Sequence, residues 1–318
     1  MTDLEAAAAL IEQADGIAIS CHQGPDGDAL GSALGFGLAA KAAGKTVTVS
    51  FSEPFVVPDN LRFLPLDLLV EPDEFPEEPG LMVVFDTGDR ARLGSLVSNS
   101  KAAKHLVVID HHVTNEGFGD VNVIDGDAGA SALLTHRLLE LLGWPLTREI
   151  ATCLHVGLVT DTGRFQYSNT TPELLESAAA MIEAGAEPAV VGQEIYESVP
   201  FGYLSVVAAV TGRAVLEPEH DFVWSLLISD DLEKAGIEPS AVPGMIDYIR
   251  IAREAETACL VKDLGGPVEV SLRSRNHVDV GAIASSAGGG GHARAAGFTY
   301  PGSAEAAVAL VRDALADG

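Results

Sequence analysis

The sequence predicts an α/β protein of two domains, an N-terminal domain with a parallel sheet and a smaller α+β domain after it. Over roughly the first 185 residues, short apolar segments alternate with longer helix-like segments, as in a parallel sheet covered by helices on both faces. Near residue 205 this alternation stops, and strand-like segments follow one another more closely. A chain of 318 residues has room for both domains.

The elements of the first domain follow in chain order from these patterns. We expect strands over the five apolar segments 16–20, 46–51, 81–85, 106–109 and 121–124. We expect helices over the segments 4–13, 29–43, 131–142, 147–159 and 172–184. The last helix ends at Gly185, with Pro188 close behind it, which is a usual stop signal.

The second domain is expected over residues 211–318, joined to the first domain, residues 1–188, by a helical linker over residues 189–210. Its strands are expected over 222–228, 255–263 and 267–273, with Gly265-Gly266 as a hairpin turn. A closing helix over 303–316 would be capped by Ser303. We expect the active site in the cleft between the two domains.

Composition narrows the functional class. No apolar run approaches the ~18 residues that a membrane span needs, so no membrane partner is expected. The acidic N-terminus lacks the basic start of an export signal, and we therefore expect a cytoplasmic protein. The three cysteines, Cys21, Cys153 and Cys259, lie far apart, which fits a reducing compartment and disfavours a cysteine-based zinc site.

Charge bears on the substrate. A net charge of −27 repels long polyanions, so long duplex DNA is not expected as a partner. Residues 243–298 are neutral, however, with six basic and six acidic side chains, and a small anionic substrate would find local attraction there. Solubility or a salty cytoplasm is an alternative cause of the excess acidity.

Carboxylates and imidazoles follow several of the apolar, strand-like runs of the first domain. They are His22, Asp26, Asp28, Asp86, Asp110, His111, His112 and Asp161. Ligands of open α/β sheets bind outside the carboxyl ends of the strands, and oxygen-rich donors with a few histidines suit Mn²⁺, Mg²⁺ or Fe²⁺. A single aspartate at a strand end is usually a helix cap, and Asp28 alone could cap the following helix. Five such sites in one domain instead favour a two-metal hydrolase.

A glycine run in the second domain is the other strong signal. Gly288, Gly289, Gly290 and Gly291 precede His292, and their bare N–H groups could form an anion-binding nest. We expect a helix-like stretch after the run, whose N-terminus would add to the site. The alternative is a flexible linker. A Rossmann phosphate loop is excluded by the spacing of the glycines.

Four features of the first domain, in chain order, resemble the DHH phosphoesterase superfamily. They are His-x-x-Pro-Asp-x-Asp from His22, a lone Asp86, Asp-His-His at Asp110 and Asp-Thr-Gly at Asp161. The resemblance implies a di-manganese centre. Its first ion would be held by His22, Asp26 and Asp86, and its second by Asp28, Asp86, His111 and Asp161. His112 would then face the substrate phosphate, and Asp110 would orient a histidine.

Three segments of the second domain are similar to the DHH-associated C-terminal domain: Ser271–Ser274, the glycine run with His292, and Ala-Ala-Gly-Phe at 295–298. The chain as a whole looks like the NrnA type within the superfamily. This resemblance implies that Arg273 and Ser274, the glycines and His292 bind the distal part of the substrate. The chain departs from the usual pattern at Ala293, where a basic residue is common, and at His155, where an aromatic residue is more usual.

We therefore expect a phosphodiesterase or exoribonuclease with two divalent ions, Mn²⁺ favoured and Mg²⁺ or Fe²⁺ as alternatives. Its partners would be short RNA oligonucleotides or linear dinucleotides, cleaved to 5′-mononucleotides, with 3′-phosphoadenosine 5′-phosphate (PAP) as a further substrate. The alternatives are hydrolysis of cyclic dinucleotides such as c-di-AMP, a nucleotide sensor without turnover, and a polyphosphate or pyrophosphate hydrolase. A homodimer stays open.

Overall fold

The computed structural model describes residues 2–115, 117–239, 242 and 244–316. It divides the chain into two compact units, Met1–Ser198 and Val199–Gly318. A parallel sheet in the first unit and a mixed sheet in the second confirm the predicted fold class. The division falls inside the expected linker: α7 (Pro188–Gly192) and the π-helix η4 (Gln193–Glu197) belong to the first unit, and α8 (Tyr203–Gly212) to the second.

The first unit is built on a five-stranded parallel sheet in the order β2-β1-β3-β4-β5. The strands are β1 Gly16–Cys21, β2 Thr46–Ser50, β3 Met82–Phe85, β4 Leu106–Asp110 and β5 Val121–Ile124. Cys21 pairs with Phe85, and Phe85 pairs with Ile109. The chain therefore leaves β1, β3 and β4 side by side at one edge of the sheet, which is where His22, Asp86 and the Asp-His-His motif follow.

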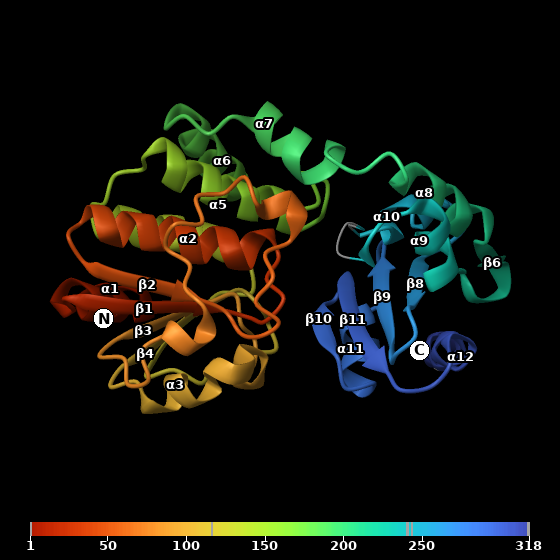
Figure 1. The fold of residues 1–318 in the computed structure, drawn as a ribbon, viewed down its shortest axis with the longest axis horizontal. Helices are drawn as coiled ribbons and strands as arrows, with labels where there is room; N and C mark the ends of the chain where they lie inside the picture. Colours follow the sequence, from red (N-terminus) through yellow and green to blue (C-terminus); the bar gives the residue numbers. More distant parts are fainter. Residues whose placement is uncertain (1, 116, 240–241, 243, 317–318) are drawn as a thin grey trace. The chain divides into compact units, whose positions relative to one another are not determined.

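Helices cover both faces of this sheet. Figure 1 shows α2 on one side of the strands and α3 on the other. The α-helices are α1 Asp3–Gln13, α2 Gly27–Ala42, α3 Val97–Ala102, α4 Ser131–Leu141, α5 Arg148–Asp161 and α6 Pro172–Glu183, with the 3₁₀ turns η1 Asp59–Leu61, η2 Pro72–Glu74 and η3 Arg90–Leu96. Because side chains alternate along a strand, Val83 packs into the larger core with α2, while Val84 packs into a smaller core with Leu93 and Leu96 of η3.

Close packing of α2 on α5 brings the carboxyl end of α5 to the same region. A Cβ on Gly31 of α2 would lie 2.3 Å from the carbonyl oxygen of Cys153, and one on Gly35 would lie 2.8 Å from the side chain of Leu154. Only glycine permits helix backbones to approach this closely. The small residues of α2 thus set the position of α5 and of Asp161, its last residue.

The second unit is a six-stranded mixed sheet in the order β10-β11-β9-β8-β7-β6. Its strands are β6 Val215–Glu217, β7 Phe222–Ile228, β8 Thr257–Asp263, β9 Val268–Ser274, β10 Gly290–His292 and β11 Ala295–Tyr300. Its other helices are η5 Pro218–His220, α9 Ser229–Ala235, α10 Ile246–Ile249, α11 Val280–Ser286 and α12 Ala304–Ala316. Gly265 has a φ of +90° in the turn between β8 and β9, and Ser303 accepts a hydrogen bond from Ala306 at the start of α12. The hairpin and the capped closing helix are as expected.

In the described part of the chain, no helix combines the length and the apolar character that a membrane span requires.

Candidate metal centre

The loop after β1 turns His22 towards two carboxylates. The ring Nδ1 of His22 donates to the carbonyl oxygen of Gln23 at 2.9 Å, which fixes the orientation of the ring. Its Nε2 lies 3.6 Å from Asp86 and 3.9 Å from Asp26. His22 and Asp86 are buried, whereas the Asp26 side chain is 57% exposed. The site is therefore open to solvent on the side of Asp26.

Asp26 and Asp28 have different local roles. Asp26 is the N-cap of α2 and accepts hydrogen bonds from the N–H groups of Asp28 and Ala29, so it fills the capping role that was the alternative for Asp28. Asp28 is fully buried and accepts from the N–H groups of Ser131 and Ala132, at 2.6 and 2.9 Å. These are the first two residues of α4, and its helix dipole favours the negative charge of Asp28.

Asp86 lies at the centre of the group. It follows β3 with a φ of +50°, a left-handed conformation that is uncommon for a residue other than glycine and that recurs at functional sites. Its side chain is buried and accepts a hydrogen bond from the hydroxyl of Ser131 at 3.0 Å. It lies 3.6 Å from His22 and 3.4 Å from His111 through different carboxylate oxygens. Its Oδ1 is also 3.6 Å from Nδ1 of His112, so one carboxylate faces three histidines.

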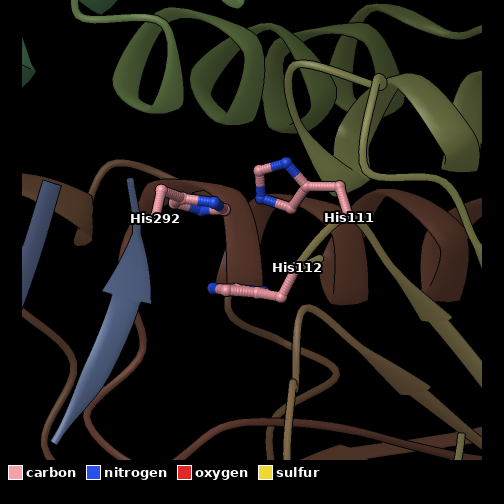
Figure 2. A group of neighbouring side chains, drawn as sticks. All are labelled: His111, His112 and His292. Atoms are coloured by element: carbon pink, nitrogen blue, oxygen red, sulfur yellow. The ribbon is translucent and has the colours of Figure 1, made fainter. Parts of the chain in front are cut away.

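The Asp-His-His motif at the end of β4 orients two neighbouring rings differently. Figure 2 shows His111 and His112 extending from consecutive positions. His111 donates from Nδ1 to the carbonyl oxygen of Ala128 at 3.0 Å, while His112 donates from Nδ1 to Asp110 at 2.7 Å. Asp110 is fully buried and also accepts from the side-chain amide of Asn115 at 2.7 Å. In both rings, Nδ1 is bound within the chain, which fixes the direction in which Nε2 points.

Asp161 reaches the group from a helix. Grouping it with the residues at strand ends is wrong, whereas the helix expected over 147–159 is confirmed, because residues 148–161 form α5. Its Oδ2 lies 3.0 Å from Nε2 of His111, and its backbone carbonyl accepts a hydrogen bond from Asn169. The Nε2 of His111 also lies 3.7 Å from Asp28, so His111 faces three carboxylates.

This crowding shifts the pKa values of the buried groups. Burial alone would lower the pKa of His22, but hydrogen bonds to the carboxylate that caps α2 and to Asp86 raise it to about 10. Burial likewise opposes charge on His111, yet Asp161 and Asp86 raise its pKa well above the ordinary value. Burial raises the pKa of Asp28 well above its usual range, and the charges of Asp86 and Asp161 add to this. The group therefore stabilises added positive charge.

The donor atoms fit divalent cations. Three sets of three donors in the first unit, each with atoms within 4.8 Å of one another, contain Asp86: His22 with Asp26 and Asp86, Asp28 with Asp86 and His111, and Asp86 with Asp110 and His112. The first two correspond to the two ions that the resemblance implies. Asp28 and Asp86 are 0 and 2% exposed and pair with no lysine or arginine among the residues that the structure describes. Buried carboxylates without a cationic partner are costly. The chemistry of the donors, imidazole and carboxylate oxygen, suits Mn²⁺ or Mg²⁺.

The second unit aligns Arg273 and His292 on one face of its sheet. Arg273 of β9 pairs with Ala295 of β11, and Ala295 pairs with His292 of β10, the strand on which Figure 2 draws that ring. Directly paired residues of antiparallel strands point to the same face. The Nε of Arg273 is buried without a hydrogen-bond partner in the described residues. Ser274, in contrast, donates its hydroxyl to the carbonyl oxygen of Val278 at 2.6 Å.

The glycine run differs from the expectation. The helix-like stretch predicted after it is the strand β11, and the helix α11 comes before it. The N–H groups of Gly288 and Gly289 donate to carbonyls of α11, at 3.0 and 2.8 Å, and so are not available to an anion. A Cβ on Gly289 would lie 2.2 Å from the carbonyl oxygen of Gly297. Part of the run therefore serves the close hairpin of β10 and β11, and Gly290 and Gly291 form its first strand residues.

Three residues of the site were not singled out from the sequence. Ser131 contacts both Asp28 and Asp86, and Asn115 holds Asp110. Gly157 on α5 leaves room for Asp28, because a Cβ there would lie 2.6 Å from its Oδ1. Ser131 directly precedes an apolar, helix-like run, and a serine in this position is usually interpreted as a helix cap. Its hydrogen bond to Asp86 could therefore not be predicted from the sequence.

The sequence matches two family models, the N-terminal domain of the DHH family over residues 16–158 and the DHHA1 domain over residues 222–317. The bifunctional oligoribonuclease and PAP phosphatase NrnA of Thermus thermophilus is 34% identical over 288 residues, which cover 90% of this chain and 84% of the relative. The protein of that name in Bacillus subtilis is 28% identical over 89% of this chain and 88% of its own length.

Solved structures agree in fold. An exopolyphosphatase-related protein from Bacteroides fragilis superposes with a TM-score of 0.89 at 22% identity, covering 99% of this chain and 96% of that one. RecJ from Thermus thermophilus in complex with Mn²⁺ gives a TM-score of 0.57 at 18% identity, covering 99% of this chain and 55% of RecJ. These comparisons confirm the resemblance drawn from the sequence. The chain belongs to the DHH family of phosphoesterases and joins the DHH domain to a DHHA1 domain.

Proposed function

We propose that this hydrolase cleaves short oligoribonucleotides or linear dinucleotides, such as pApA and pGpG, to 5′-mononucleotides, and removes the 3′-phosphate of PAP. The observation that carries the proposal is that two donor sets, His22 with Asp26 and Asp28 with His111, meet at Asp86. Relatives named as oligoribonuclease and PAP phosphatase, at up to 34% identity over nearly the whole chain, support the choice of substrate.

Two divalent ions, with Mn²⁺ favoured and Mg²⁺ or Fe²⁺ as alternatives, fit the donors. One would be held by His22, Asp26 and Asp86, and the other by Asp28, Asp86, His111 and Asp161. Bound there, such ions would supply an activated water and neutralise charge on the phosphate oxygens. The chain itself contributes the fixed positions of the donors, because each ligand histidine is anchored through Nδ1 to a backbone carbonyl.

His112 is proposed as the residue that acts on the reacting phosphate, with Asp110 as its positioning partner. Asp110 holds the Nδ1 proton of His112 at 2.7 Å. Nε2 is then the atom that gives a proton to the leaving oxygen or binds a phosphate oxygen. The negative charge of Asp110 stabilises the protonated ring, and together with Asp86 it raises the pKa of His112 against the opposing effect of burial.

Arg273 and His292 are proposed to bind the part of the substrate that is not cleaved. They share one sheet face, and alanines flank Arg273 on both neighbouring strands, at Ala258 and Ala295. These side chains are small, and the Nη1 of Arg273 donates to the carbonyl oxygen of Leu272 at 2.9 Å, which holds the guanidinium in place. Gly290 and Gly291 remain candidates for backbone contacts to the substrate, whereas Ser274 would act by bracing the loop after β9.

A substrate panel tests the function. Purified protein with Mn²⁺ is given pApA, pGpG, RNAs of two to five nucleotides, a 20-mer, PAP and c-di-AMP, and products are separated by chromatography. We expect 5′-mononucleotides from the short linear substrates and loss of turnover after exhaustive chelation. Full activity in chelated protein would contradict the metal proposal. Tight binding of these nucleotides without any product would instead favour a sensor.

Two variants separate metal binding from proton transfer. Asp86→Ala should lower the metal content more than any other single ligand change, because Asp86 belongs to both donor sets. His112→Ala should keep the metal and lose turnover. Equal metal content in Asp86→Ala and wild type, measured by elemental analysis, would refute the shared role.

The contribution of the second unit is tested by substrate length. Arg273→Ala should raise KM for dinucleotides more than for a chromogenic phosphodiester, which lacks a distal part. Arg253, whose side chain is 89% exposed and pairs with Glu254, provides the matched control. We expect short RNAs to be cut faster than the 20-mer in wild type. A flat profile of kcat/KM with length, unchanged in Arg273→Ala, would overturn this assignment.

A further inference from the structure

The first unit contains a cavity of about 370 Å³ that no step of the proposed reaction uses. It lies among α5, α6 and the segment 188–196. Most of its lining is apolar, with Val159, Phe165, Ala178, Ile182 and the ring of Tyr196 among the walls. Its size falls within the range of ~300–1,000 Å³ that is typical of sites for small molecules.

The cavity and the metal centre lie on opposite faces of α5. Gly157 and Asp161, four residues apart, share the face that meets Asp28 and His111. His155 and Val159, also four residues apart, line the cavity. Because each helical residue turns by about 100°, the two pairs are offset by roughly half a turn. The cavity is therefore a separate site with one helix between it and the donor cluster.

Two polar groups give the cavity a chemical preference. His155 is 1% exposed, and its Nδ1 has no hydrogen-bond partner in the described residues. Burial lowers the pKa of His155, so the ring is neutral and offers a polar nitrogen rather than a charge. Arg164 is exposed at the rim, with its guanidinium 3.8 Å from the centre of the Tyr196 ring.

The backbone beside the cavity is strained. Arg164 and Phe165, both of which line it, have φ values of +64° and +61°. Two consecutive residues other than glycine in this conformation cost free energy, and such strain clusters at binding sites. The strained turn holds the Arg164 guanidinium and the Phe165 ring at the same cavity.

We propose that this cavity is a second ligand site, for a small aromatic carboxylate with a polar atom in its ring. The ring would lie between Phe165 and Tyr196, the ring heteroatom would meet Nδ1 of His155, and the carboxylate would pair with Arg164. In a chain of net charge −27, a cation that forms no ion pair within the described residues is a specific attractor for an anion.

Indole-3-acetate is the probe that tests the site, because it carries a ring N–H and one carboxylate. Binding to the full-length protein is followed by calorimetry or ligand-observed NMR. A compound of this size should bind with a dissociation constant on the order of 1 mM. Naphthalene-1-acetate, which lacks the ring nitrogen, should bind about three- to tenfold more weakly. Equal affinity of the two compounds would overturn the contact with His155.

A cavity-filling variant supplies the decisive control. Gly192 lines the cavity as the last residue of α7, and a Cβ there meets no atom within 4 Å. Gly192→Phe should fill the cavity without backbone strain and weaken probe binding at least about tenfold. Gly212, the last residue of α8, has equally open space around it, and Gly212→Phe should bind as wild type does.

Charge reversal tests the role of Arg164. Arg164→Glu should lose indole-3-acetate and instead bind tryptamine, which carries the opposite charge on the same ring. The proposal is overturned if wild type shows no saturable binding up to about 10 mM probe, or if Gly192→Phe and wild type bind the probe equally.

Discussion

Replacing Gly157 by alanine should damage the proposed metal centre while leaving the fold largely intact. A Cβ at this position would lie 2.6 Å from Oδ1 of Asp28 and 2.7 Å from the Cβ of Ala132. An ordinary contact begins near 3.4 Å, so the Asp28 carboxylate or α5 must retreat by about 0.8 Å. Asp28 has little freedom to retreat, because two N–H groups at the start of α4 hold it at 2.6 and 2.9 Å.

The expected losses of stability and of activity differ widely. Overpacking a tight core costs about 1–3 kcal/mol, and alanine in place of a helical glycine returns about 1 kcal/mol. The net loss of about 0–2 kcal/mol corresponds to a fall in Tm of a few degrees. A catalytic or ligand group displaced by nearly 1 Å, in contrast, can cost roughly 100-fold in rate. We therefore expect kcat/KM to fall by about 10- to 100-fold in a folded protein.

Gly35→Ala is the matched control for this prediction. Gly35 lies in the same contact of α2 with α5, but the atom that its Cβ would meet, at 2.8 Å, belongs to the flexible end of Leu154. Both variants should be compared in Tm, in Mn²⁺ affinity and in kcat/KM on a chromogenic phosphodiester. The reasoning fails if Gly157→Ala keeps wild-type Mn²⁺ affinity and kcat/KM, or if Gly35→Ala loses as much as Gly157→Ala.

Three further changes test other contacts. Asp110→Asn removes the charge that holds the Nδ1 proton of His112, so kcat should fall at least about 100-fold with metal content unchanged; loss of metal would show that Asp110 acts otherwise. Ser131→Ala removes the hydroxyl that donates to Asp86 and should weaken Mn²⁺ binding about 10- to 100-fold, measured by titration; unchanged affinity would argue against this support. The Arg312 guanidinium, which donates to Glu217, lowers the pKa of that carboxyl. The pair therefore stabilises the fold above the unfolded pKa of about 4.3, and this stability is lost as pH falls through the folded pKa. Glu217→Gln should flatten the fall of Tm between about pH 5 and pH 3, and an unchanged slope would refute the linkage.

The location of the donor cluster could be predicted because parallel strands share a direction. The apolar runs before His22, Asp86 and Asp110 are short and bounded, and all three form strands of one sheet. Their carboxyl ends must then meet at one edge. Chain order alone therefore brought together side chains separated by up to 88 positions, without knowledge of any tertiary contact.

The prediction that Asp161 lies at a strand end was wrong for a physical reason. The run before it is apolar almost throughout, since α5 packs on α2 and α4 along one side and lines the cavity with α6 along the other. A helix buried on both sides shows no polar stripe, so the apolar run up to residue 160 was grouped with the strand ends even though a helix was expected over 147–159. The glycine run misled in a similar way, because close packing of a hairpin and binding of an anion both require a bare backbone.

His111 and His112 are adjacent residues of the same type, but their hydrogen-bond partners differ, and we expect this difference to give the two rings different chemical roles. His111 donates through Nδ1 to a neutral carbonyl, which directs Nε2 towards Asp28, Asp86 and Asp161. Against the effect of burial, Asp161 and Asp86 raise the pKa of His111, so Nε2 carries a proton that a cation bound there would replace. His112 donates through Nδ1 to the buried carboxylate of Asp110, which favours a second proton on the ring. A ring whose Nε2 faces several carboxylates suits a metal ligand, and a ring whose Nδ1 proton is held by one buried carboxylate suits proton transfer through Nε2. Since Ala128 and Asp110 are both fixed by the end of β4 and the loop after β5, the sheet edge itself orients the two rings for the roles proposed for them.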